Sequence, residues 1–157
     1  MKLWVKILVF VVVANLLGGL GAIVTVPAIA DWYETLTKPP AVPPNQVFGP
    51  TWTVLYAMIG ASLAIFLHRV PSSPAKRLAT VWFSVQMVLN LIWSPIFFGA
   101  HWMGIGLIVL VSLWIALLVT ILKFFPLDRL AGALLIPYFL WVSYATYLNA
   151  GYWWLNR

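Results

Sequence analysis

The chain has 157 residues, of which 64% are hydrophobic and only 8% are charged, and it contains no cysteine. Soluble domains carry about 25% charged residues, so this composition excludes an ordinary soluble domain and indicates an integral membrane protein. The lack of cysteine excludes disulfides, thiolate metal sites and cysteine nucleophiles. The net charge of +6 does not indicate nucleic-acid binding, because every Lys and Arg lies at the edge of an apolar run, as in membrane proteins.

Five apolar runs are each long enough to cross a bilayer, which takes about 20 helical residues. They cover residues 5–27, 46–68, 78–99, 103–124 and 130–152. The links between them are short, so sequential helices should be antiparallel neighbours. The sequence therefore predicts an all-α membrane protein, a single domain over 1–157 built as a five-transmembrane-helix bundle.

The first run has an alternative interpretation as a signal peptide. Lys2 and Lys6 precede an apolar stretch that ends in an A-x-A sequence at 28–30, the pattern of a cleavage site. The run is, however, longer than a usual signal core, and it contains Asn15 and a glycine cluster. Its small residues also repeat at the spacing of close helix–helix contacts, at Ala14, Gly18 and Ala22. We expect the span to be retained.

A proline-rich segment, residues 31–45, separates the first two runs, and we call it the lid loop. Proline has no backbone N–H and clashes with the preceding helical turn. The four that exclude a helix here are Pro39, Pro40, Pro43 and Pro44. A stiff, aromatic-bearing loop over a membrane bundle is expected to act as a lid over a pocket.

The distribution of Lys and Arg predicts the orientation. Seven fall on the N-terminal side of the bundle, namely Lys2, Lys6, Arg69, Lys76, Arg77, Lys123 and Arg129. Only Lys38 and Arg157 fall on the other side. The positive-inside rule then places the N-terminus in the cytoplasm of a bacterial cell and the lid loop outside.

Aromatic and amide side chains recur every three or four residues on three of the predicted helices, so each set shares one helix face. The stripes are Phe48, Trp52 and Tyr56; Trp82, Gln86, Asn90, Trp93 and Phe97; and Tyr138, Trp141, Ala145, Leu148 and Tyr152. With a helical rise of about 1.5 Å per residue, Trp52, Asn90, Trp93, Trp141 and Ala145 should lie in the half of the bundle beneath the lid loop.

These stripes allow two interpretations. Uncharged amides in hydrocarbon must be paired, so Gln86 and Asn90 should face inward, either bonded to neighbouring helices or in contact with a ligand. The two interpretations are balanced for Gln86, whereas ligand contact is favoured for Asn90. Trp93, Trp114 and Trp141 lie too deep for an interfacial belt. They favour a slot for a large planar apolar ligand, with simple core packing as the alternative.

Three segments, WYETLTKPPAVPPNQVFGPTWTVLY, QMVLNLIWSPIFFG and PYFLWVSYATYLN, resemble the translocator protein family, also called tryptophan-rich sensory proteins. The similarity covers essentially the whole chain. It implies a five-helix membrane protein, commonly a homodimer, that binds protoporphyrin IX or haem as ligand without an obligatory cofactor. Relatives also bind isoquinoline carboxamides, benzodiazepines and cholesterol.

The resemblance assigns roles to matching residues. Trp52 and Trp141 match tryptophans placed against the ligand and implicated in light- and oxygen-dependent porphyrin breakdown. Asn90, Trp93 and Ala145 match pocket positions, with Tyr33 and Pro44 coming from the lid loop. The full expected ligand-binding set is Tyr33, Pro44, Phe48, Trp52, Tyr56, Gln86, Asn90, Trp93, Tyr138, Trp141, Ala145 and Asn149.

A sterol pattern, L/V-x(1–5)-Y-x(1–5)-K/R, is matched by Leu148, Tyr152 and Arg157, but such patterns are weakly specific. The chain departs from animal relatives here, because Ala150 rather than tyrosine follows Asn149. A bacterial membrane that lacks sterols would offer the motif no ligand.

No conventional catalytic or metal site is expected. The three carboxylates, Asp31, Glu34 and Asp128, lie in predicted loops. His68 and His101 fall at opposite membrane faces, so they cannot share one haem iron. His101 near the pocket mouth is either an interfacial residue, which we favour, or a single axial ligand.

Three functions remain: a porphyrin-binding sensor or scavenger, a transporter of porphyrins or lipids and sterols, and a light-dependent catalyst of porphyrin breakdown. We favour binding, with membrane lipid and a second copy of the chain as the expected partners. Away from their ends the predicted spans contain no charged residue, so an ion-coupled transporter would lack its usual parts.

Overall fold

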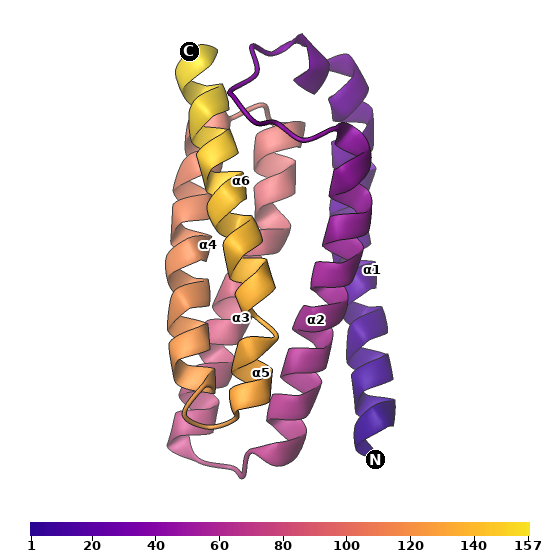
Figure 1. The fold of residues 1–157 in the computed structure, drawn as a ribbon, viewed down its shortest axis with the longest axis vertical. Helices are drawn as coiled ribbons and strands as arrows, with labels where there is room; N and C mark the ends of the chain where they lie inside the picture. Colours follow the sequence, from indigo (N-terminus) through magenta and orange to yellow (C-terminus); the bar gives the residue numbers. More distant parts are fainter.

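The computed structural model describes residues 1–157 and confirms the predicted all-helical fold, with five helical segments long and apolar enough to span a membrane (Figure 1). The long helices are α1 (Leu3–Asp31), α2 (Phe48–Arg69), α3 (Pro74–Ser94), α4 (Met103–Phe124) and α6 (Ile136–Leu155), with the short α5 (Arg129–Ala133) before α6. Two short 3₁₀ turns, η1 (Tyr33–Thr35) and η2 (Asn45–Val47), lie near the ends of the lid loop.

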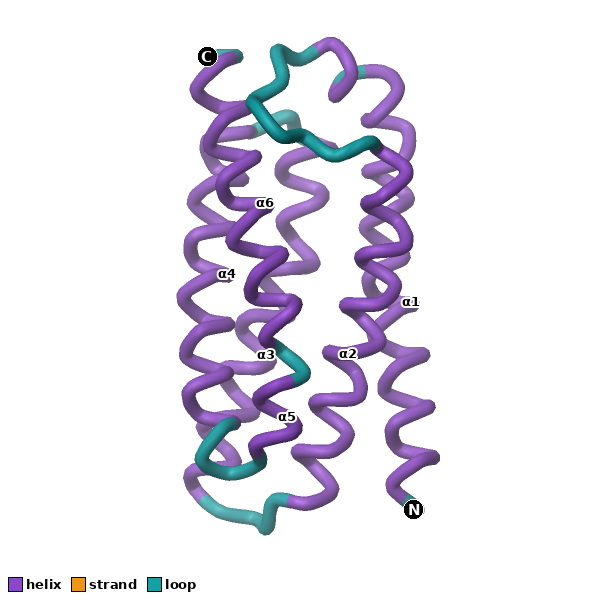
Figure 2. Tube along the Cα trace, viewed as in Figure 1, coloured by secondary structure: helices purple, strands orange, loops and turns teal.

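The long helices run up and down, and each packs against particular neighbours. Helix α1 packs mainly on α2, whereas α4 packs on both α3 and α6. Helices α2 and α6 touch only slightly. The tube view shows helices throughout, with loops confined to the two ends of the bundle and to the break between α5 and α6 (Figure 2).

Proline shapes the third span. Pro74 occupies the first turn of α3, where its missing N–H costs nothing, and the Ser73 hydroxyl accepts a hydrogen bond from the Lys76 N–H (3.1 Å). The helix therefore begins earlier than the predicted residue 78. At the other end Pro95 cannot continue the α-helical hydrogen bonds, and the span finishes as a π-helical turn, η3 (Pro95–Gly99).

The fifth span, expected over 130–152, runs from Arg129 to Leu155 and is divided by a short turn into α5 and α6. Pro137 has no N–H to bond the Ala133 carbonyl four residues earlier. The chain breaks there, and the Ser62 hydroxyl of α2 donates a hydrogen bond to the Ala131 carbonyl (2.7 Å). The break is thus stabilised by a side chain from another helix.

The two ends of the bundle differ in charge. The N-terminus, the α2–α3 turn and the α4–α5 turn lie at one end, which we call the basic end, and the lid loop and C-terminus lie at the other, the lid end (Figure 1). The basic end therefore carries the seven Lys and Arg residues that were predicted to lie on the N-terminal side of the bundle. Asp128 caps α5 there by accepting from the Ala131 N–H (2.9 Å), and it lies 3.7 Å from Arg69.

The lid loop is fastened to α6 at several points. The Asn156 side chain bonds both the N–H and the carbonyl of Thr37, at 2.8 and 3.0 Å. The Tyr147 hydroxyl donates to the Pro40 carbonyl (3.1 Å), and the Tyr144 hydroxyl donates to that of Ala41. These contacts hold the loop across the lid end of the bundle (Figure 2).

The start of the lid loop is anchored by an aromatic and an ion pair. Tyr33 is buried, with its ring centroid 4.8 Å from that of Tyr152 and 5.6 Å from that of Phe98. The Lys38 ammonium donates to the Glu34 carboxylate at 2.8 Å, and this hydrogen bond raises the pKa of Lys38. The pair is exposed, so it orients the loop more than it stabilises the fold.

Candidate ligand cavity beneath the lid loop

A cavity of about 480 Å³ lies beneath the lid loop, lined by α1, α2, α3, η3, α6 and the loop itself. Small-molecule sites span about 300–1,000 Å³, so the volume suits an organic ligand. None of the lining residues is Asp, Glu, Lys, Arg or His. The cavity therefore favours a ligand whose enclosed part is uncharged.

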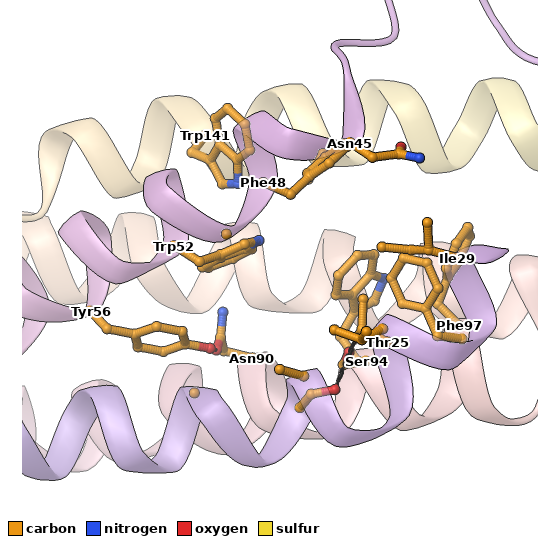
Figure 3. Close-up of a pocket in the computed structure, with 18 of the residues that line it drawn as sticks. Thr25, Ile29, Asn45, Phe48, Trp52, Tyr56, Asn90, Ser94, Phe97 and Trp141 are labelled. Atoms are coloured by element: carbon orange, nitrogen blue, oxygen red, sulfur yellow. Dashed lines mark hydrogen bonds between the residues drawn. The ribbon is translucent and has the colours of Figure 1, made fainter. Parts of the chain in front are cut away.

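One wall is aromatic and comes from α2 and α6, the two helices that barely touch. The Trp52 and Trp141 rings meet edge to face at 6.4 Å and 87°, and Phe48 lies 6.1 Å from Trp141 (Figure 3). Neither of these two indole N–H groups has a hydrogen-bond partner in the protein, whereas Trp93 Nε1 donates to Asn149 Oδ1 (3.2 Å). Trp52 and Trp141 thus offer flat apolar faces and free donors.

The deep end of the cavity is polar. The Tyr56 hydroxyl donates to Asn90 Oδ1 at 2.6 Å, and the Tyr56 ring lies 5.5 Å from that of Trp52 (Figure 3). The Asn90 amide nitrogen points away from Tyr56 and has no partner in the protein. Asn90 Nδ2 is therefore a donor available to a ligand.

The opposite wall is the lid-end half of α1. There the hydroxyls of Thr25 and Ser94 are hydrogen-bonded to each other, which joins α1 to α3, and Thr25 also donates to the Gly21 carbonyl (2.9 Å). A Cβ added at Gly21 would lie 3.4 Å from Ser94. This distance is ordinary van der Waals contact, and the Thr25–Ser94 pair is what joins α1 to α3 along this wall.

The structure brings most of the sequence-predicted site residues to this one cavity. Those that line it are Tyr33, Phe48, Trp52, Tyr56, Asn90, Trp93, Trp141, Ala145 and Asn149, together with Leu148 and Tyr152 of the sterol pattern. Leu148 and Tyr152 are buried, so they face the bundle interior rather than surrounding lipid.

Four predicted residues lie outside the cavity lining. Pro44 precedes the lining residue Asn45, and Arg157 lies over the Trp154 ring at 3.6 Å. Gln86 and Tyr138 are fully buried, and the Gln86 amide atoms and the Tyr138 hydroxyl have no hydrogen-bond partner. The structure thus separates Gln86 from Asn90, although both belong to one stripe of α3.

Helix α1 and several flanking residues also line the cavity, which the sequence patterns did not predict. The additional lining residues include Asn15, Gly18, Ala22, Thr25, Ile29 and Ser94. In the sequence Asn15 argues against a signal peptide and the glycines favour close helix contact, and neither is interpreted there as part of a cavity wall. A polar residue near the middle of the span, followed by glycines toward the lid loop, is the signal that could have predicted this pocket wall.

The histidines lie apart from the cavity. His101, which has a left-handed backbone (φ 59°), stacks on Trp32 with ring centroids 4.1 Å apart. His68 is exposed in the last turn of α2, at the basic end. No group of three or more His, Cys, Asp or Glu side chains could hold a metal ion.

Five spanning helices around an uncharged aromatic cavity define a multi-pass integral membrane protein with an internal small-molecule site. Residues 10–155 match the TspO/MBR family. The chain therefore belongs to this family, and it is a membrane protein of the sensory or translocator type.

Several relatives support this membership. The chain is 42% identical to the tryptophan-rich protein TspO of Chlorobaculum tepidum over 124 residues, which cover 78% of each chain. It is 36% identical to protein CrtK of Rhodobacter capsulatus, over 94% of this chain and 91% of that protein. It is also 34% identical to the human translocator protein, over 78% of this chain and 73% of that protein.

Proposed function

We propose that the protein binds tetrapyrroles, protoporphyrin IX and haem, in the cavity beneath the lid loop, and acts in porphyrin sensing or scavenging. The observation that carries the proposal is the uncharged cavity walled by Phe48, Trp52 and Trp141. A porphyrin is a large aromatic plane, and stacked or edge-on indoles are its natural partners. Trp52 and Trp141 are thus the principal contacts.

The absence of charge in the lining supports one orientation of the porphyrin. Burying an ionised carboxylate without a partner is costly, so the two propionates would stay at the mouth of the cavity. Asn45 and Gln46 line the cavity at the lid end, and Lys38 lies in the lid loop. The apolar vinyl edge of the macrocycle would enter first.

Haem would bind as an aromatic plane rather than through its iron. Neither His68 nor His101 lines the cavity, so no histidine is available there as an iron ligand. Free-base protoporphyrin and haem should therefore bind with similar affinity. Neutral aromatic compounds such as isoquinoline carboxamides and benzodiazepines suit the same walls, with Asn90 Nδ2 as their donor.

The proposal extends to light- and oxygen-dependent porphyrin breakdown. A bound porphyrin absorbs light and passes energy to molecular oxygen, which is the oxidant, and Trp52 and Trp141 lie where the macrocycle would be held. These two indoles would position the ring and would themselves be exposed to the oxidant formed.

A protoporphyrin titration in nanodiscs, followed by illumination in air, tests both parts. Tryptophan quenching and porphyrin absorbance would be compared for wild type, Trp52→Phe, Trp141→Phe and the double variant. Trp114→Phe is the matched control, since its indole bonds Ser143 (2.8 Å) outside the cavity. Saturable binding that weakens only in the cavity variants supports the site. Loss of porphyrin faster than free bleaching supports breakdown, and unsaturable binding refutes the proposal.

We further propose that the basic end faces the bacterial cytoplasm, that the lid loop faces outward, and that the protein forms a homodimer in lipid. Because the chain has no cysteine, single cysteines introduced at Ser72 and at Thr37 would report the two sides of the membrane to a membrane-impermeant thiol reagent.

The transporter alternative has its own test. Vectorial porphyrin flux in liposomes would favour it over sensing or scavenging.

A further inference from the structure

Gly18 of α1 lies directly against the Tyr56 ring of α2. A Cβ added at Gly18 would lie 2.1 Å from Tyr56 Cε2, 2.4 Å from Cδ2 and 2.5 Å from Cζ. Real Cβ atoms essentially never approach another heavy atom closer than 3.0 Å. The ring can therefore occupy this place only because residue 18 has no side chain.

The position of this ring decides what the Tyr56 hydroxyl can reach. In the structure the hydroxyl lies 2.6 Å from Asn90 Oδ1, a short hydrogen bond between two buried groups. An amide whose oxygen is held by a donor must present its nitrogen on the other side. The Asn90 nitrogen accordingly points toward Trp52 and the cavity (Figure 3).

We infer that Gly18 and Tyr56 are positioning residues that hold the Asn90 amide with its N–H₂ group facing the cavity. The deep end of the site is thereby a hydrogen-bond donor, and the site selects neutral aromatic ligands that carry an acceptor such as a carbonyl. This inference rests on the proposed function, because it requires that the cavity bind a ligand.

Other groups at the deep end do not supply this orientation. The Asn15 side chain donates to the Val11 carbonyl of its own helix (3.0 Å), so its bond is local. Gln86 lies one turn from Asn90 but makes no hydrogen bond. Tyr56 is thus the one side chain hydrogen-bonded to the Asn90 amide, and Gly18 is the residue that admits its ring.

The test uses a matched pair of probes, 9-fluorenone and fluorene, which share a planar skeleton but differ in the carbonyl. Their dissociation constants would be measured by tryptophan quenching in nanodiscs. A neutral hydrogen bond contributes about 0.5–1.5 kcal/mol, so wild type should prefer fluorenone by about twofold to tenfold. The ratio of the two constants is the readout, because changes in cavity volume affect both probes alike.

Four variants distinguish the roles. Tyr56→Phe keeps the ring but loses the hydroxyl, and Gly18→Ala displaces the ring, so each should reduce the ratio toward one. Asn90→Leu removes the donor and should do the same. Leu20→Ala on the same helix is the control, since Leu20 is exposed and does not line the cavity, and it should keep the wild-type ratio.

The infrared carbonyl band of bound fluorenone gives a second readout that a purely structural role would not move. A hydrogen-bonded carbonyl absorbs at lower frequency than a free one. The band should lie low in wild type and in Leu20→Ala, and shift up in Tyr56→Phe. This conservative variant keeps the test decisive if Gly18→Ala fails to fold.

The possible results separate this inference from the proposed function. If protoporphyrin binds saturably but wild type does not prefer fluorenone, or if Tyr56→Phe keeps the full preference, the positioning role is overturned while tetrapyrrole binding stands. If the preference survives in Asn90→Leu, the donor lies elsewhere and the inference fails. If none of the three compounds binds saturably, both fail.

Discussion

Helices α1 and α2 cross at Gly60, and enlarging this residue should drive them apart. A Cβ at position 60 would lie 2.5 Å from the Phe10 carbonyl oxygen, 2.7 Å from its carbonyl carbon and 2.8 Å from Val11 Cα. Ordinary contact begins at 3.4 Å, so Gly60→Ala requires a separation of about 0.9 Å, comparable to the small-residue requirement at other membrane helix crossings. The obstructing atoms are backbone, so no side-chain rotation can relieve the clash.

Overpacking of this kind costs about 1–3 kcal/mol, which corresponds to a melting temperature lower by about 2–12 °C for a chain of this size. Thermal unfolding in nanodiscs, followed by circular dichroism at one scan rate, would measure the change. Gly49→Ala, on the same helix, is the matched control, because a Cβ at position 49 would meet no atom within 4 Å. Equal melting temperatures for Gly60→Ala and Gly49→Ala would refute the packing argument.

Three further substitutions test the lid, the buried amide and the break in the fifth span. Asn156→Ala removes two hydrogen bonds to Thr37 and should speed protoporphyrin dissociation by about threefold to tenfold. Stopped-flow fluorescence would measure the dissociation rate. An unchanged rate would show that the lid loop does not limit release. Gln86→Leu replaces an unpaired buried amide by an apolar group of similar volume and should raise the melting temperature by a few degrees without weakening porphyrin binding. Weaker binding would instead indicate a ligand contact. Ser62→Ala leaves the Ala131 carbonyl without its partner and should cost about 1–2 kcal/mol in chemical unfolding; no loss would contradict the proposed stabilisation of the α5–α6 break.

Much of the site could be predicted because its aromatic residues are periodic on single helices. Trp52, Asn90 and Trp141 were placed beneath the lid by helical rise alone, and all three line the cavity. The same periodicity placed Gln86 beside Asn90 on the α3 stripe, yet only Asn90 reaches the cavity. The reason is that the deep end of the cavity is bounded by Tyr56 of α2. The pattern of residues within α3 does not predict the position of α2.

The sequence by itself determined the features that depend on near neighbours in the chain. Apolar length defined five spans, proline prevented a helix over much of the lid loop, and the placement of Lys and Arg distinguished the two ends. Each of these effects acts through the local backbone or through the membrane as solvent, so each can be derived without knowing which helices touch.

Only the tertiary structure decided which helix faces meet. It turned the glycine-bearing face of α1 into a cavity wall, set Gly18 against Tyr56, and left α2 and α6 far enough apart for Trp52 and Trp141 to lie between them. It also placed Ser62 of α2 where its hydroxyl bonds the Ala131 carbonyl beside the break in the fifth span. These outcomes depend on the rotation of each helix about its axis and on its neighbours, which are fixed by packing among residues distant in sequence.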